Sequence, residues 1–439
     1  MKNTIIQLLK SEVKPALGCT EPVAVALAVA KAREVLGEEC LECTIEVSAN
    51  IYKNGMGVGI PGSNGKIGLE IAAAMGLLGG DSKLGLAVLE SVEESQIDEA
   101  QRMVDEGFIK ISPVKEGDRI FTRAVLKGEN SIAEAVISTK HDNFVLVKKD
   151  NQVILNTCMS NITGSASSQN ESPVVKLTIK ELIQLVEELE LRDIEFLLEG
   201  IEMNRKMADK GLSQRLGAGV GYSLKLAIED GFISADLINM AMMITAAASD
   251  ARMSGVKMSV MSSNGSGNHG LTAILPIAAY NDKYPQSDEK LAKALAISHL
   301  VIAYVKNYTG RLSAVCGCGV AASVGSTAAI AWLMDLGYEA IEGAISNVIA
   351  NLSGMICDGA KAGCAYKLSS AAAAAMQSAI NVKYGSIVPK FNGIVGETVE
   401  ESIRNLGEVS DRGMRVTDDV IVDVMDRMNK NKSASIIMV

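Results

Sequence analysis

Four cysteines fall within 50 residues of one another in the last third of the chain: Cys316 and Cys318 are separated by one residue, and Cys357 and Cys364 by six. Glycine and alanine surround both pairs, which lets a bulky inorganic group approach the backbone. Thiolates in an apolar setting are ligands for iron–sulfur clusters. Four thiolates also suit zinc, although the paired C-x2–4-C spacing of structural zinc sites is missing. On spacing alone, an iron–sulfur cluster is favoured over zinc and over plain core cysteines.

A fifth cysteine stands in "GCTEP", residues 18–22, where a helix is expected to begin. Thr20 can cap this helix, and Pro22 is tolerated in its first turn because that position needs no N–H donor. Cys19 then lies just outside the helix N-terminus, where the dipole and free N–H groups favour a thiolate. Such a thiolate could act as a general base or a nucleophile. The alternative is a small buried hydrophobic residue before a cap.

The segment "SSNGSGNHG", residues 262–270, is a candidate anion-binding turn before an apolar helix. Asn264, Gly265 and Ser266 offer backbone N–H groups, and their side chains add an amide and a hydroxyl. His269 follows closely. A lone histidine is more often a structural residue than a ligand, and we expect that of His269.

Other motifs carry less information. "NGMGVGIPGSNGK", residues 54–66, contains a G-x-G-x-x-G match, but Pro61 lies in the turn and no βαβ unit follows. We expect this loop to offer backbone N–H groups to a carboxylate rather than to bind a dinucleotide. Cys40 and Cys43 would point to opposite faces of a strand, which is poor geometry for one metal. Cys158 receives no role.

Composition excludes several function classes. The 439 residues predict two domains. A net charge of −10 without a basic run argues against nucleic acid as a partner.

The first residues lack the apolar segment of a signal peptide. The uncharged stretch 312–334 is rich in Ser, Thr and Gly and has no basic flank, so we expect buried core there and no membrane partner. Because we interpret the cysteines as metal ligands or catalytic groups, we expect a cytoplasmic protein without disulfides.

The elements that must position these residues form an α+β pattern. Helical periodicity covers most of residues 1–37, with a break at "PALGCTEP", and resumes after the glycine-rich loop. Strands are expected at 41–50, 108–113, 119–126, 131–138, 143–148 and 152–156. A Ser, Thr, Asn and Gly-rich linker spans 159–173, and helices dominate from about 176. The expected domains are a mixed α/β domain over 1–165 and an all-helical domain over 172–439, with the site between them.

Taken together, "GCTEP", "SSNGSGNHG", "CGCGVAAS" and "CDGAKAGC" resemble the L-cysteine desulfidase family, which is related to the alpha chain of iron–sulfur L-serine dehydratases. The resemblance runs nearly the full length. It implies a [4Fe–4S] cluster held by Cys318, Cys357 and Cys364, with one iron open to substrate and Cys316 as a neighbouring spare thiol. It also implies that Cys19 is the base that removes the Cα proton of a small amino-acid substrate.

The expected reaction is elimination of sulfide from L-cysteine, leaving pyruvate and ammonia. The loop of Asn264, Gly265 and Ser266 is expected to bind the α-carboxylate, with Lys66 as a charge partner. The serine dehydratases carry a Ser-His-Thr type segment where this chain has "GCTEP", which favours a thiol substrate over serine. L-Serine dehydration, a non-catalytic iron–sulfur sensor and a zinc-stabilised structural protein are the alternatives. The Ala/Gly-rich helical surfaces favour a homodimer.

Overall fold

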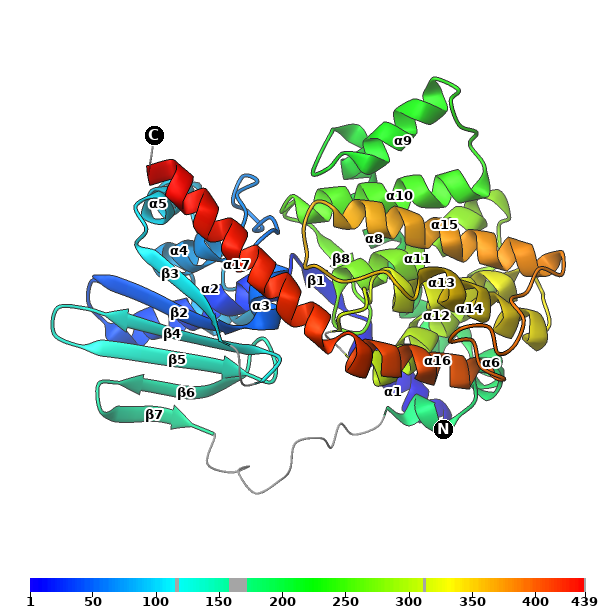
Figure 1. The fold of residues 1–439 in the computed structure, drawn as a ribbon, viewed down its shortest axis with the longest axis horizontal. Helices are drawn as coiled ribbons and strands as arrows, with labels where there is room; N and C mark the ends of the chain where they lie inside the picture. The colour runs from blue at the N-terminus through cyan, green and yellow to red at the C-terminus, as the bar shows by residue number, and fades with distance from the viewer. Residues whose placement is uncertain (115–117, 158–171, 311–312, 438–439) are drawn as a thin grey trace.

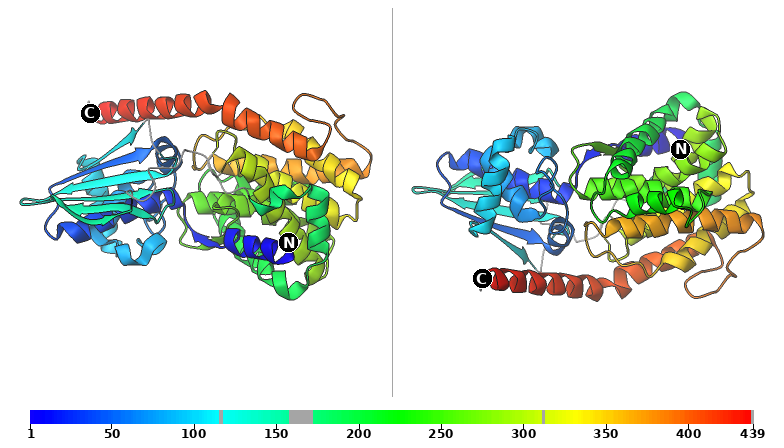
Figure 2. Two further views of the ribbon diagram at one scale, coloured as in Figure 1. Left: turned by 90° about the horizontal axis from the view of Figure 1, so that it is seen from below. Right: turned by 90° about the horizontal axis from the view of Figure 1, so that it is seen from above.

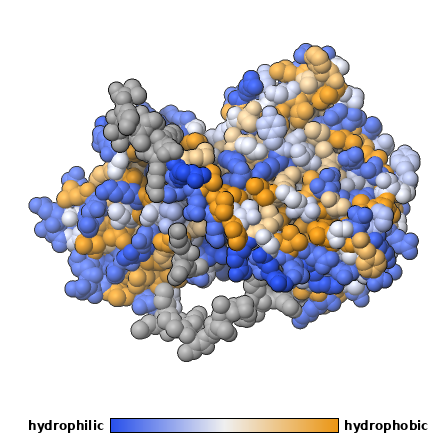
Figure 3. All heavy atoms as spheres, viewed as in Figure 1, coloured by the Kyte–Doolittle hydropathy of each residue, from blue (hydrophilic) through white to orange (hydrophobic). Residues whose placement is uncertain are grey.

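The computed structural model describes residues 1–114, 118–157, 172–310 and 313–437. It confirms the α+β class: a mixed sheet and its helices form the N-terminal part, and the C-terminal part is mostly helical (Figure 1). The expected linker lies almost entirely outside the described residues, as does Cys158. A space-filling view shows two lobes with a notch between them at the upper edge (Figure 3).

The N-terminal part is built on a six-stranded sheet in the order β3-β2-β4-β5-β6-β7. The pair β2–β3 is parallel and the other pairs are antiparallel. The strands are β2 (Glu42–Ser48), β3 (Ile109–Val114), β4 (Phe121–Lys127), β5 (Ile132–Ser138), β6 (Phe144–Lys149) and β7 (Gln152–Asn156). Each strand expected from the sequence is thus present, within two residues at most bounds.

The sheet has one apolar face and one charged face because its side chains alternate along each strand. Ile45 and Leu126 are buried against the helices. On the charged face, Arg123 bonds Glu134 at 2.7 Å and Glu46 at 2.9 Å. The covering elements are α2 (Thr20–Leu36), α3 (Ala49–Gly55), α4 (Leu69–Gly79), a 3-10 turn (Ser82–Ala87) and α5 (Glu94–Asp105).

Helix α2 is buried nearly all round, between the sheet and α4. The crossing with α4 is close because residue 76 is a glycine: a Cβ there would lie 2.5 Å from the Ala26 carbonyl oxygen. The helix ends at Gly37, whose φ of 69° suits a residue without a side chain. This tight packing fixes the start of α2, and with it Cys19.

The helical part surrounds α13, which packs against α11, α12, α14 and α15 and is almost entirely buried. The α13 part of the uncharged stretch is therefore core, and no helix in the described residues is long and apolar enough to cross a membrane. The helices are α6 (Ile179–Glu187), α7 (Leu191–Ile194), α8 (Glu199–Ser213), α9 (Val220–Glu229), α10 (Leu237–Met253), α11 (Gly267–Lys283), α12 (Asp288–Thr309), α13 (Val320–Leu333), α14 (Tyr338–Leu352), α15 (Cys364–Lys383) and α16 (Val399–Glu408).

The chain ends cross between the two parts. Helix α1 (Lys2–Glu12) buries Ile5 and Leu9 in the core of the helical part. Helix α17 (Arg415–Ile437) runs back along the N-terminal part, where Val422 joins the core of the sheet and its helices (Figure 1, Figure 2). Each part therefore includes one segment from the opposite end of the sequence.

Candidate active site

A short antiparallel ladder joins the two motifs that lie about 240 residues apart. Strand β1 (Pro15–Leu17) pairs with β8 (Ser259–Met261), and Leu17 faces Ser259. Because the ladder is antiparallel, "GCTEP", which follows β1, and "SSNGSGNHG", which follows β8, leave it at opposite ends. The Arg252 guanidinium links the two motifs, since it donates to the Gly18 carbonyl at 2.5 Å and to the Asn268 side-chain oxygen at 3.0 Å. The Ser262 hydroxyl donates to the Lys14 carbonyl at 2.6 Å, and this bond extends the pairing.

Cys19 is itself the N-cap residue of α2, with an extended backbone (φ −93°, ψ 136°). The sequence predicted Thr20 as the cap, but Thr20 is the first helical residue and its hydroxyl bonds Glu21 at 3.4 Å. Gly18 has a φ of 67° and packs so closely on Pro61 that a Cβ at Gly18 would lie 2.3 Å from the proline ring. The turn before α2 is thus held by the 54–66 loop.

Burial dominates the electrostatics of Cys19. The residue is 5% exposed, and desolvation raises the pKa of its thiol to about 11, although the charge and hydrogen bond of Arg252 act in the opposite direction. Glu21 and Cys364 raise this pKa further. The helix N-terminus was expected to favour a thiolate; in the described structure, loss of water outweighs it. Cys19 is therefore a thiol at neutral pH before anything binds.

The loop between β8 and α11 turns sharply at Asn264 (φ 49°) and Gly265 (φ 83°). The Asn264 side chain donates to the His299 carbonyl at 3.3 Å, so it holds the loop against α12. The Ser266 hydroxyl lies 3.8 Å from the Cys318 sulfur. The loop expected to bind substrate therefore borders the cysteine-rich segment.

The four cysteines of the helical part are brought together by a second short pairing. The Cys316 N–H donates to the Met355 carbonyl at 2.8 Å, and the Cys357 N–H donates to the Ala314 carbonyl at 2.7 Å. The pKa of the Cys316 thiol is raised chiefly by Cys318, while Cys357 acts to lower it. Cys316, the residue expected to be the spare thiol, is thus coupled electrostatically to both of its neighbours.

Cys364 completes the group at the start of α15, where its thiol contacts the Gly359 carbonyl at 3.5 Å. Burial raises its pKa, and its charge couples to those of Cys357 and Cys316. In the described residues no three His, Cys, Asp or Glu side chains are arranged to hold a metal ion. The donors fit an iron–sulfur cluster in kind and proximity, since a cluster binds each thiolate at a different iron. They do not converge on one point as the ligands of a single ion do.

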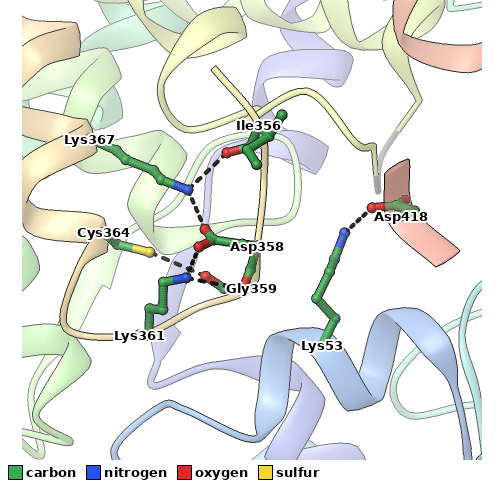
Figure 4. A network of polar contacts seen from close by, with 8 residues as sticks. All are labelled: Lys53, Ile356, Asp358, Gly359, Lys361, Cys364, Lys367 and Asp418. Carbon is green, nitrogen blue, oxygen red and sulfur yellow. Dashed lines mark hydrogen bonds and ion pairs between the residues drawn. The ribbon is translucent and has the colours of Figure 1, made fainter. Parts of the chain in front are cut away.

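A lysine–carboxylate network supports the segment between Cys357 and Cys364 (Figure 4). Asp358 forms ion pairs with both Lys361 and Lys367, and Lys367 also donates to the Ile356 carbonyl at 2.8 Å. Burial alone would raise the pKa of Asp358, but the two lysines more than offset this and hold the pKa below its ordinary value. Sequence reasoning assigned nothing to these charges, although they stand inside "CDGAKAGC" and just after it.

Lys66 was expected near the substrate, but its ammonium faces Asp98 of α5 at 3.8 Å. The loop that carries it does border the site: the Gly59 N–H donates to the Met253 carbonyl at 2.8 Å, and Gly57 pairs with Lys361. The backbone of this loop, rather than the Lys66 side chain, lies beside the candidate residues.

Buried histidines and cations complete the site. The ring of His269 contacts the Ser263 carbonyl at 3.2 Å, and a Cβ at Gly317 would lie 2.4 Å from its Nε2 and 3.1 Å from the Lys306 Nζ. The ring of His299 contacts the Ser263 hydroxyl at 2.9 Å. Burial lowers the pKa of both histidines to about 3, so both rings are neutral. Sequence reasoning missed His299 and Lys306, which give no local signal within an apolar helix.

A cavity of about 600 Å³ lies between the two parts and under α17, and its described lining residues include no cysteine. Ala314, whose carbonyl binds the Cys357 N–H, lines it together with Lys53 and Asp418. Lys53 is 2% exposed and pairs with Asp418 at 2.5 Å (Figure 4).

Comparison with known proteins identifies relatives along the whole chain. The serine dehydratase alpha chain family matches residues 83–423. A UPF0597 protein of Clostridioides difficile (strain 630) is 60% identical and covers 97% of this chain and 100% of its own. A UPF0597 protein of Alkaliphilus metalliredigens (strain QYMF) is 47% identical over 99% of this chain and 97% of its own. A UPF0597 protein of Alkaliphilus oremlandii (strain OhILAs) is 48% identical over 98% of this chain and 99% of its own. The matched region includes the 262–270 loop and all four clustered cysteines, and the chain belongs to the serine dehydratase alpha chain family.

Proposed function

We propose that the protein is an iron–sulfur-dependent L-cysteine desulfidase, which converts L-cysteine and water to pyruvate, ammonia and hydrogen sulfide. The observation that carries the proposal is the position of Cys19. The Arg252 guanidinium links Gly18, the residue before Cys19, to Asn268, which follows the Ser262–Ser266 loop. The Cys19 thiol, at the N-cap of α2, also interacts electrostatically with Cys364. A potential base, an anion-binding loop and a group of cysteines thus meet where the two parts of the chain join.

Cys318, Cys357 and Cys364 would hold a [4Fe–4S] cluster, with Cys316 as the competing choice for the first position because its pKa responds to both Cys318 and Cys357. When bound, the cluster supplies a Lewis-acidic iron that attracts the sulfur of the substrate and weakens its Cβ–S bond. A cytoplasmic location is part of this proposal, because a reducing compartment keeps the cluster-binding thiols reduced.

Cys19 would act once it is deprotonated, by taking the proton from Cα of the bound amino acid. The electron pair left on Cα forms the Cα–Cβ double bond as the Cβ–S bond breaks, and sulfide leaves with the electrons of that bond. The product, 2-aminoacrylate, tautomerises to an imine. Water then hydrolyses the imine to pyruvate and ammonia. The buried setting of Cys19, 5% exposed, excludes water from the proton-transfer step.

L-Serine dehydration is the second candidate, because the family that matches residues 83–423 is described by that substrate. The same chain residues would serve, with hydroxide rather than sulfide leaving from Cβ. The two candidates differ in the leaving group alone, so turnover of the two amino acids separates them.

The test is product release from L-cysteine and L-serine by protein that is purified without oxygen and reconstituted with iron and sulfide. We expect equal amounts of sulfide and pyruvate from L-cysteine, with loss of turnover in Cys19→Ala and Cys357→Ala. Cys40→Ala is the matched control, since that half-buried thiol lies just before β2, where it donates to the Glu42 carbonyl at 3.3 Å. Comparing Cys316→Ala with Cys318→Ala, by iron content, assigns the first ligand.

Faster turnover of L-serine would make the protein a dehydratase. A bound cluster without turnover of either amino acid would overturn the proposal and leave the non-catalytic sensor. Bound zinc in place of iron and sulfide would overturn the cluster assignment.

A further inference from the structure

Arg252 is a buried cation that none of the motifs singled out. It lies in the last turn of α10, and only 5% of it is exposed. A guanidinium stays charged even when buried, so its removal from water must be balanced by nearby partners. The groups that balance the charge of the guanidinium therefore indicate the role of Arg252.

The described structure supplies neutral partners to Arg252 and no carboxylate. Its Nη2 donates to the Gly18 carbonyl at 2.5 Å, and its Nη1 donates to the Asn268 side-chain oxygen at 3.0 Å. Its Nε is buried without a hydrogen-bond partner. Glu21, a nearby carboxylate, is engaged by Thr20 at 3.4 Å and by Asn54 at 3.3 Å. A buried donor left unpaired is costly, so this position is suited to binding an anion.

Two helix N-termini meet at the same point. Helix α2 begins directly after Cys19, and helix α11 begins at Gly267. The guanidinium lies so close to the first turn of α11 that a Cβ at Gly267 would be 2.4 Å from Nε. Free N–H groups and the positive ends of two 17-residue helices add to the charge of Arg252. The positive field here favours a small anion.

We propose that Arg252 binds the α-carboxylate of the amino-acid substrate and sets Cα against Cys19. The inference rests on the proposed function, because it takes an α-amino acid as the substrate. Arg252 donates to the carbonyl of Gly18, the residue directly before Cys19, so a carboxylate on the guanidinium brings the adjacent Cα–H to the base. The β-substituent then extends along the loop toward Ser266, which lies 3.8 Å from Cys318. Arg252 takes the role that the sequence suggested for Lys66.

The competing explanation is that Arg252 only ties Gly18 to Asn268. Hydrogen bonds with a purely structural role stabilise the fold, but they do not distinguish a ligand that has a carboxylate from a ligand that lacks one. The preference for a carboxylate is therefore the quantity to measure. The ratio of two dissociation constants in one variant also does not depend on the fraction of protein that folds.

The experiment uses reconstituted protein and titration calorimetry with L-alanine, which has no group to eliminate, and ethylamine, which lacks the carboxylate. We expect wild type to bind L-alanine at least tenfold more tightly than ethylamine. The preference for L-alanine over ethylamine should fall about tenfold in Arg252→Lys and disappear in Arg252→Gln. The reason is the loss of a charge-assisted, forked hydrogen bond to the carboxylate. Gly267→Ala, which presses a methyl group on the guanidinium, should weaken L-alanine binding while keeping Arg252. Arg205→Gln, which removes a surface arginine paired with Asp282, is the matched control.

Retention of the preference in Arg252→Gln, or its absence in wild type, would overturn the inference. If L-cysteine is turned over while Arg252→Gln keeps the preference, the proposed function stands and the inference fails. If L-alanine binding depends on Arg252 but neither L-cysteine nor L-serine is turned over, the inference stands and the proposed function fails. In an active protein, Arg252→Lys should raise KM for L-cysteine more than it lowers kcat.

Discussion

Cys19 combines a position suited to a base with an environment that keeps it protonated. Because burial raises its pKa to about 11, the thiolate fraction increases about tenfold with each pH unit up to that value. Alkylation of Cys19 by iodoacetamide should therefore accelerate about tenfold per unit from pH 7 to 10. Peptide mass spectrometry measures this at the single residue. A plateau below pH 9 would contradict the expected pKa.

His299 gives a second prediction, on stability. Its folded pKa of about 3 lies below the ordinary 6.5 because the ring is buried, so below pH 6.5 the unfolded chain binds a proton that the folded chain does not. The free energy of unfolding should fall as pH decreases from 6.5 toward 3, by up to about 1.4 kcal/mol per pH unit from this residue. Urea unfolding between pH 7 and 5 measures the slope. His299→Gln should flatten it, leaving the similar contribution of His269.

At the residue scale, sequence reasoning identified thiols but not the charges around them. Cys19, Cys357 and the Ser266 loop carry local signals, namely a helix start, paired cysteines and a glycine-rich turn. Arg252 has no such signal, because it stands at the end of an apolar helix and its importance arises only from burial beside Gly18. Long-range packing, which periodicity does not encode, decides which charges are buried.

Among the elements, the β1–β8 ladder depends on a close approach of α11. A Cβ at Gly270 would lie 1.9 Å from the Met261 carbonyl oxygen, which is backbone and cannot move aside without breaking the ladder. Gly270→Ala should lower the free energy of unfolding by about 1–3 kcal/mol and impair activity. Gly337→Ala, at the start of α14, is the control because nothing lies within 4 Å of a Cβ there. Equal urea midpoints for the two variants would refute the expected clash.

The long elements could be predicted from sequence, and the short ones that build the site could not. Residues 121–127 alternate between buried and half-buried side chains, as expected of a strand with one face in the core, whereas 132–138 are buried on both faces after Ile132. Strands β1 and β8 have three residues each, too few for a period to be read. Their pairing is stabilised by partners far away in the sequence, such as Ser262 with Lys14. The same holds for the short pairing between Cys316 and Met355.

For the whole molecule, the pair between Lys53 and Asp418 joins α17 to the N-terminal part beside the cavity. Asp418→Asn would leave a lysine that is 2% exposed without its carboxylate, at a cost of about 1–3 kcal/mol. Thermal unfolding should show the loss, and the double variant with Lys53→Met should recover part of it. Asp423→Asn removes the same charge from an exposed position on α17 and serves as the control. Equal stability of the two single variants would exclude the expected role.

The homodimer stays a prediction. Several aromatic side chains of the helical part are largely exposed, among them Phe232, Tyr384 and Phe391. Sedimentation velocity at micromolar concentration should give twice the mass of one chain. A single species with the mass of one chain would contradict the expectation.

The crossing of the chain ends has a consequence for synthesis on the ribosome. The N-terminal part emerges first, yet Val422 of α17 belongs to its core, and the partner of β1 begins only at Ser259. Its apolar surface under α17 therefore stays uncovered until nearly the whole chain has been made, and Cys19 acquires its surroundings only after the middle of the chain emerges. A nascent chain in that state exposes hydrophobic surface, which is where chaperones bind and where aggregation starts. Truncation before α17 is expected to leave a product that the cell retains on chaperones or degrades.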